Sequence, residues 1–157
     1  MDTWAELDRD EYDLVWDRFD DVFEFRPEYH ERVKPAISEP SPFVTFNLAD
    51  DRADARLDAV NALFLNAFRA VIPADGRMFV LDWQHTSYSY FPHRGDGKWP
   101  LGIYPDGDYF IFLADDFSFG TFGHPWQLSL CVFGQPLLNA LDGRLHQLLN
   151  VVRSAGG

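Results

Sequence analysis

The sequence of 157 residues contains a single cysteine, Cys131. One cysteine cannot form an intrachain disulfide, and it cannot supply the thiolates of a cysteine-rich zinc site. The sequence also lacks an apolar run of the roughly 18 residues that a membrane span needs. Its first residues lack the basic segment and apolar core of a signal peptide. These absences predict a cytoplasmic protein.

Basic residues are scarce, with 13 Lys and Arg against 25 Asp and Glu, for a formal net charge of −12. Sequence-independent binding to nucleic acid depends on clustered Lys and Arg, and an anionic membrane surface attracts the same kind of cluster. We therefore expect neither a nucleic-acid nor a membrane partner. The charge is uneven, because residues 1–75 carry 18 acidic and 8 basic residues, while residues 76–157 carry 7 and 5.

Several catalytic signatures are missing as well. The sequence contains no Gly-x-Ser-x-Gly elbow, no phosphate-binding Gly-x-x-x-x-Gly-Lys-[Ser/Thr] loop and no Gly-x-Gly-x-x-Gly turn. Cys131 lies inside the apolar run 128–133, where a thiol behaves as a small buried hydrophobe. These observations disfavour an ATPase or a dehydrogenase, favour a protein that is not an enzyme, and predict no cofactor and no resident metal.

Aromatic residues, by contrast, are abundant at 17% of the chain, which is enough to fill a substantial core. Apolar residues at helical spacing predict an amphipathic helix over about residues 10–26. A strand is predicted at 43–48, and a second helix begins at residue 50 or 51 and runs to about residue 71. The buried stripe of the first helix is expected to contain Tyr12, Val15, Trp16, Phe19, Val22 and Phe23.

The second half of the chain changes to short β-rich runs separated by Gly, Pro and Asp. Strands are predicted at 78–83, 86–91, 101–104, 109–114 and 127–133. Residues 105–108 have the composition of a hairpin turn, and such short connections imply antiparallel pairing. The fold class predicted is α+β, with an antiparallel sheet of five to six strands and helices packed on one face.

A single domain over residues 1–157 is expected, because two domains of half this length would each have a marginal core. It divides into an acidic helical half to about residue 72, a sheet-rich half over about 78–133 and a C-terminal helix over about 135–152. Asp142-Gly143 is expected to bend or split that last helix.

Histidines, carboxylates and tryptophans near the predicted strand ends are candidates for a ligand pocket. Asp82 and His85 end a predicted strand, where they can bind a divalent metal, act as a general base, or simply make a structural hydrogen bond. The loop 122–126 can line an aromatic pocket or form a tight connection that fills the core. The pocket candidates are Asp82, Trp83, His85, Trp99, Asp116, His124 and Trp126.

A set of acids on the outer face of the first helix is a second candidate surface. Like charges four residues apart destabilise a helix by about 0.2–0.5 kcal/mol per pair. The stripe is either a solvated face or a docking surface that attracts a basic protein by electrostatic steering. The docking candidates are Asp13, Asp17, Asp20, Asp21 and Glu24.

Four segments of the second half carry a resemblance to a known family. They are Leu81-Asp82-Trp83-Gln84-His85, Tyr104-Pro105-Asp106-Gly107-Asp108-Tyr109, Phe122-Gly123-His124-Pro125-Trp126 and Cys131-Val132-Phe133-Gly134. Together with the first helix, they make the chain similar to a bacterial family called domain of unknown function 2716. That family has no established activity, so the resemblance implies no mechanism and no site residues.

Two functions from different classes remain open. The first is a non-catalytic binding module whose acidic helix face docks a basic protein, with an immunity or antitoxin-like protein as one form. The second is a small-molecule binding protein or enzyme with a His/Asp/Trp-lined pocket on the sheet half. They differ in whether His85, His124, Asp116 and Trp126 surround one cavity.

Overall fold

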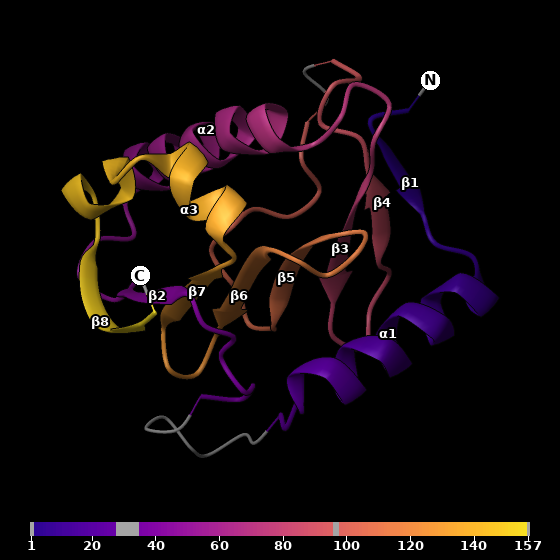
Figure 1. The fold of residues 1–157 in the computed structure, drawn as a ribbon, viewed down its shortest axis with the longest axis horizontal. Coiled ribbons are helices and arrows are strands. Elements are labelled where there is room, and N and C mark those ends of the chain that lie inside the picture. The colour runs from indigo at the N-terminus through magenta and orange to yellow at the C-terminus, as the bar shows by residue number, and fades with distance from the viewer. Residues whose placement is uncertain (1, 28–34, 96–97, 157) are drawn as a thin grey trace.

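A computed structural model describes residues 2–27, 35–95 and 98–156 of the chain. The described part is built on one eight-stranded antiparallel sheet with the strand order β1-β4-β3-β5-β6-β7-β2-β8 (Figure 1). The strands are β1 Trp4–Glu6, β2 Phe43–Asn47, β3 Met78–Asp82, β4 Tyr88–Tyr90, β5 Phe110–Ala114, β6 Gly120–His124, β7 Ser129–Phe133 and β8 Asn150–Ala155. The helices are α1 Arg9–Phe23, α2 Asp54–Val71, α3 Gln135–Leu141 and the 3₁₀ helix η1 Arg144–Gln147.

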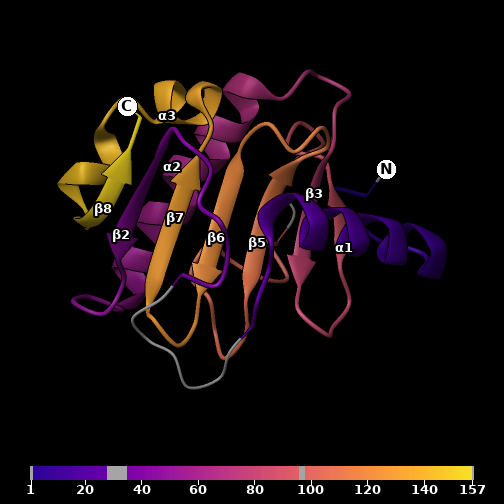
Figure 2. The same cartoon turned by 60° about the horizontal axis from the view of Figure 1, so that its bottom comes forward.

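Helices cover both faces of the sheet, so the expectation that they pack on one face is wrong. Figure 2 shows α1 in front of the strands and α2 and α3 behind them. Val80 and Phe112 belong to the core under α2 and α3, while Leu81 and Ile111 belong to the core under α1. All five residues of β5 are buried, and a strand that is apolar throughout is typical of a sheet covered on both faces.

The first helix places its apolar stripe on the sheet as its spacing predicts. Asp8 is the N-cap of this helix, because its side chain accepts a hydrogen bond from the backbone N–H of Glu11 at 2.8 Å. Val22, expected in the stripe, is instead 54% exposed. The residues that α1 buries are Val15, Trp16, Phe19 and Phe23.

The sheet has eight strands, so the expectation of five to six is wrong. Three of them, β1, β6 and β8, lie outside the predicted set, and one predicted strand is not formed. Residues 101–104 form no strand. They run beside α2 instead, where the backbone N–H of Ile103 donates to Asn61 Oδ1 at 3.0 Å. Residues 105–108 are therefore not a hairpin turn but the loop that leads into β5.

The expected helix over 135–152 is also corrected. The helix α3 ends at Leu141, because Asp142 and Gly143 both take left-handed backbone conformations, with φ of 50° and 69°. After η1, residues 150–155 form β8, which pairs with β2 and is one edge of the sheet. The predicted break at Asp142-Gly143 is confirmed, whereas helix beyond it is limited to the single turn η1.

An ion pair fixes β8 to the segment before β2. Arg153 donates from Nε to Glu39 Oε1 at 2.6 Å and from Nη2 to Glu39 Oε2 at 2.9 Å. The hydroxyl of Thr45 also donates to Glu39 Oε2 at 2.6 Å. Because the Glu39 side chain is only 7% exposed, these partners replace the water that would otherwise solvate its carboxylate.

Replacing Arg153 is expected to destabilise the fold strongly. Arg153→Ala leaves the Glu39 carboxylate buried without its guanidinium, which costs about 3 kcal/mol in free energy of unfolding. Urea unfolding followed by circular dichroism measures this loss. Arg144→Ala, which removes an exposed cation from η1, is the control and should change stability by less than about 0.5 kcal/mol. A loss below about 1 kcal/mol for Arg153→Ala would mean that water screens the pair.

Candidate functional site

The antiparallel pairing of β3 with β5 brings together residues that are 26 positions apart in the sequence. Asp82 is paired with Phe110, so the residues just before β5 lie next to the turn that follows β3. In that turn the backbone N–H of His85 donates to the carbonyl of Asp82 at 3.1 Å. Gln84 has a φ of 64°, an unfavourable value for a residue with a side chain. The turn places His85 beside Asp82 and Asp108.

Asp82, His85 and Asp108 form what we call the Asp–His cluster. His85 Nδ1 lies 2.6 Å from Asp108 Oδ2 and 3.4 Å from Asp82 Oδ1. The side chains of Asp82 and Asp108 are 19% and 12% exposed, whereas that of His85 is 66% exposed. Two largely buried carboxylates therefore meet under an imidazole that faces water.

The electrostatics of the Asp–His cluster follow from this crowding. Burial, and next the neighbouring Asp108, raise the pKa of the Asp82 carboxyl to about 7 against the opposing effect of His85. The hydrogen bond to Asp108 raises the pKa of His85, and the charge of Asp82 acts in the same direction. The cluster thus favours positive charge close to its two carboxylates.

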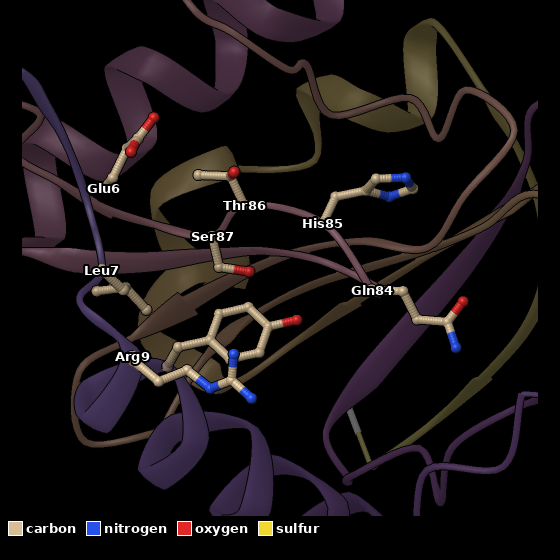
Figure 3. A pocket seen from close by; sticks show the side chains of 8 residues that line it. Glu6, Leu7, Arg9, Gln84, His85, Thr86 and Ser87 are labelled. Atoms are coloured by element: carbon tan, nitrogen blue, oxygen red, sulfur yellow. The ribbon is translucent and has the colours of Figure 1, made fainter.

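A cavity of about 660 Å³, open to solvent, adjoins the cluster (Figure 3). One wall comes from the segment joining β1 to α1 and the other from the turn after β3. In Figure 3 the ring of His85 points away from Leu7 and Arg9, so this imidazole forms the rim of the cavity. The lining residues are Glu6, Leu7, Arg9, Tyr12, Gln84, His85, Thr86 and Ser87.

His124 ends β6, at the same end of the strands as the start of β5, and it is buried, at 2% exposed. Its Nδ1 accepts hydrogen bonds from the backbone N–H groups of Trp126 at 3.3 Å and Gln127 at 3.1 Å. Burial, and next the positive charge of Arg153, lower the pKa of His124 to about 4. The imidazole is therefore neutral at pH 7 and holds the turn between β6 and β7.

Two tryptophans that follow strand ends, Trp83 after β3 and Trp126 after β6, pack against the core under α1. The ring of Trp83 lies edge-on to Tyr109, with ring centroids 5.7 Å apart. Trp126 is partly buried in the same core. Trp83 directly follows Asp82 in the chain, but neither Trp83 nor Trp126 lines the 660 Å³ cavity.

Trp99 and Asp116 lie far from the other pocket candidates. Trp99 packs on the opposite face of the sheet, 5.9 Å from Trp4 between ring centroids. Asp116 follows β5, so the length of that strand separates it from Asp108. Asp116 Oδ1 accepts hydrogen bonds from Ser118, which lower its pKa. The structure brings Asp82 and His85 together but places Trp99 and Asp116 elsewhere.

Asp108 is the cluster residue that the list of pocket candidates lacks. The sequence around it suits a hairpin turn, and that interpretation assigned its carboxylate to the turn. The signal that locates Asp108 is strand pairing, because a β3–β5 register that opposes Asp82 to Phe110 puts residue 108 beside the end of β3. Arg9 and Tyr12, which line the cavity, have no sequence signal that separates them from other residues of α1.

Four acids of α1 and the residue that ends it form what we call the acidic face, and all five are exposed: Asp13, Asp17, Asp20, Asp21 and Glu24. Glu24 lies just beyond the helix, at its C-cap, with a φ of 51°. The helix also contains two arginines, Arg9 and Arg18. Arg9 pairs with Asp13 at 3.4 Å. Arg18 lies over the ring of Phe117 at 4.2 Å and donates to the carbonyl of Asp116 at 3.3 Å. The last turn of α1 contains no basic residue.

These features define an α+β protein with one antiparallel sheet between helices and an acidic outer helix. None of the helices in the described part of the chain has the length and apolar character that crossing a bilayer requires. The chain belongs to the family described as "Protein of unknown function (DUF2716)", whose model matches residues 6–138. This confirms the resemblance found in the sequence.

The chain is also similar to "Uncharacterized protein YxiI" of Bacillus subtilis (strain 168). The two are 29% identical over 158 residues, which cover 90% of this chain and 94% of that protein. No solved structure matches the chain.

The buried His124 is expected to make the fold sensitive to acid. Its pKa falls from 6.5 to about 4 on folding, so below pH 6.5 the unfolded chain binds a proton that the folded chain excludes. The contribution of His124 to stability is fully present above pH 6.5 and decreases by up to about 3 kcal/mol as the pH drops to 4. The raised pKa of Asp82 acts in the opposite direction over this range, so the effect of His124 is the difference between wild type and a variant without this imidazole. Urea unfolding at a series of pH values measures this slope.

His124→Asn supplies the matched comparison, because the amide oxygen can accept the same backbone hydrogen bonds without titrating. Its stability should depend less on pH between 6.5 and 4 than that of the wild type. His146→Asn, at an exposed imidazole, should keep the wild-type slope. Identical slopes for wild type and His124→Asn would contradict the assignment.

Proposed function

We propose that this protein is a binding module that docks a basic protein partner on the acidic face of α1. An immunity or antitoxin-like protein that covers a cationic toxin is one form of this function. The observation that carries the proposal is the set of acids at the C-terminal end of α1, where they oppose the stability of their own helix.

The C-terminal end of a helix is the negative end of its dipole, so each acid there is unfavourable by about 0.3–1 kcal/mol. Asp20 and Asp21 occupy this end, and no basic residue is present in the last turn to offset them. Partial burial raises the pKa of Asp20, and the charges of Asp17 and Asp21 raise it further. Ionised Asp20 therefore destabilises the folded state at neutral pH. A cationic partner would remove this cost.

Apolar side chains border the acids. Leu14 is 71% exposed and Val22 is 54% exposed, both on α1. Apolar contacts surrounded by charged groups are the usual composition of a protein interface. The net charge of −12 adds long-range attraction for a basic protein and speeds their encounter.

Neutralising the acids is expected to stabilise the isolated protein. The triple variant Asp17→Asn, Asp20→Asn, Asp21→Asn removes like-charge pairs and unfavourable dipole interactions, which raises the free energy of unfolding by about 1 kcal/mol at low salt. The gain should shrink at high salt. Because the folded-state pKa of Asp20 is raised, the gain should also shrink as acid protonates this carboxyl in the wild type.

The matched control removes the same number of charges from other exposed positions. Asp58, Asp75 and Asp106 lie outside α1 and are exposed. Their triple Asn variant should change stability by less than about 0.5 kcal/mol. Equal stabilisation by both triple variants would show that net charge, rather than the acidic face, sets the effect.

Binding is tested by affinity capture from a lysate of the native host, with wild type and both triple variants as bait. A basic protein is expected on the wild type and on the control variant, but not on the α1 variant. The same protein should be released at ~1 M salt, where charges more than about 3 Å apart are screened. Capture that is unchanged by the α1 substitutions or by salt would overturn the proposal.

The cavity of about 660 Å³ beside His85 supports a second candidate, a small-molecule binding protein or enzyme. Its walls offer the guanidinium of Arg9 and the hydroxyl groups of Tyr12 and Thr86. A thermal-shift screen on wild type and His85→Ala tests this function, because a ligand at the cavity should stabilise the wild type more. A screen without any such difference would exclude it.

A further inference from the structure

We propose that Asp82, His85 and Asp108 bind one divalent transition-metal cation, with Zn²⁺ as the preferred ion. Each residue offers one ligand atom, and these atoms all lie within 4.8 Å of one another. The site is separate from the acidic face, so it goes beyond the proposed function.

Two of the distances between ligand atoms can be compared with those of a zinc site. Zn–N and Zn–O bonds of about 2.0–2.2 Å in a tetrahedral site set the ligand atoms about 3.3–3.6 Å apart. His85 Nδ1 is already 3.4 Å from Asp82 Oδ1. Its distance of 2.6 Å to Asp108 Oδ2 has to open by about 0.7 Å to reach that spacing. The exposed imidazole of His85 can make this movement by a small side-chain rotation.

Hydrogen bonds orient the carboxylate of Asp108 and hold the backbone of Asp82. Asp108 Oδ1 accepts the backbone N–H of Tyr109 at 2.9 Å, which leaves Oδ2 directed at His85. The backbone N–H of Asp82 donates to Ser87 Oγ at 3.2 Å, and Trp16 Nε1 donates to the same oxygen at 3.3 Å. Hydrogen bonds of this kind around ligand residues hold metal sites in shape.

The surroundings of Asp82 support a cation at this position. Within the part of the chain that the structure describes, Asp82 Oδ1 is buried and accepts no hydrogen bond. A buried carboxylate oxygen without a donor is costly. A metal ion between Asp82 and His85 would satisfy this oxygen.

The donor set selects the kind of ion. One imidazole nitrogen with two carboxylate oxygens favours Zn²⁺ or a similar transition metal over Mg²⁺ and Ca²⁺, which prefer sites built from oxygen alone. Three protein ligands leave a fourth position, which faces solvent on the exposed side of His85.

The test is calorimetric titration of the chelator-treated full chain with Zn²⁺, Mg²⁺ and Ca²⁺. We expect one Zn²⁺ per chain, weaker or no binding of Mg²⁺ and Ca²⁺, and a Zn²⁺-dependent rise in melting temperature. Titration with Co²⁺ should give the visible absorption of a tetrahedral site. His85→Gln and Asp108→Asn should each weaken Zn²⁺ binding by at least about 10-fold.

Matched controls separate this site from adventitious binding at the surface. Asp106→Asn removes an exposed carboxylate from the same loop, and His146→Gln removes an exposed imidazole from η1. Both should keep wild-type Zn²⁺ affinity, and so should the α1 triple variant, whatever becomes of the partner-binding proposal. The inference is overturned if Zn²⁺ does not bind, if His85→Gln and Asp108→Asn bind it unchanged, or if the controls lose it equally. In each of those outcomes the cluster is an Asp–His ion pair only.

Discussion

Burial of the central strands on both faces is the constraint on which the rest of the fold depends. Every residue of β5, β6 and β7 is buried, and such strands need an apolar layer on each side. The helices α2 and α3 supply one layer, and α1 supplies the other with residues such as Trp16 and Phe19. Because α1 is a single helix on its face, its outer surface is left to solvent, and that is where its acids lie.

The same constraint explains what could be predicted from the sequence. Helical spacing located α1 and α2, and apolar runs located β3, β5 and β7, since these signals are local. β1 and β8 could not be found in this way. β1 has only three residues, and β8 owes its position to pairing with β2 and to the contact of Arg153 with Glu39, 114 positions away. The leucines before β8 continue a helical spacing that the left-handed Asp142 and Gly143 interrupt.

The candidate site likewise contains residues that can be grouped from the sequence and residues that only the topology brings together. Asp82 and His85 are close in sequence, and their meeting follows from one turn. Asp108 joins them only through the β3–β5 register. Trp99 is separated from them because it packs against the core on the other covered face of the sheet. Residue type indicates which side chains can do chemistry, whereas topology decides which of them meet. In an antiparallel sheet, the end of one strand lies beside the start of its neighbour, so residues at these two positions come together.

The place of β2 in the sheet has a consequence for the order in which the fold can form. This strand comes from residues 43–47, yet its two neighbours, β7 and β8, come from residues 129–133 and 150–155. During synthesis on the ribosome, β2 emerges long before either neighbour exists. Closure of such long loops is slow, and an unpaired strand is prone to associate with other chains. The nascent chain therefore carries β2 without a neighbouring strand until β7 has been made.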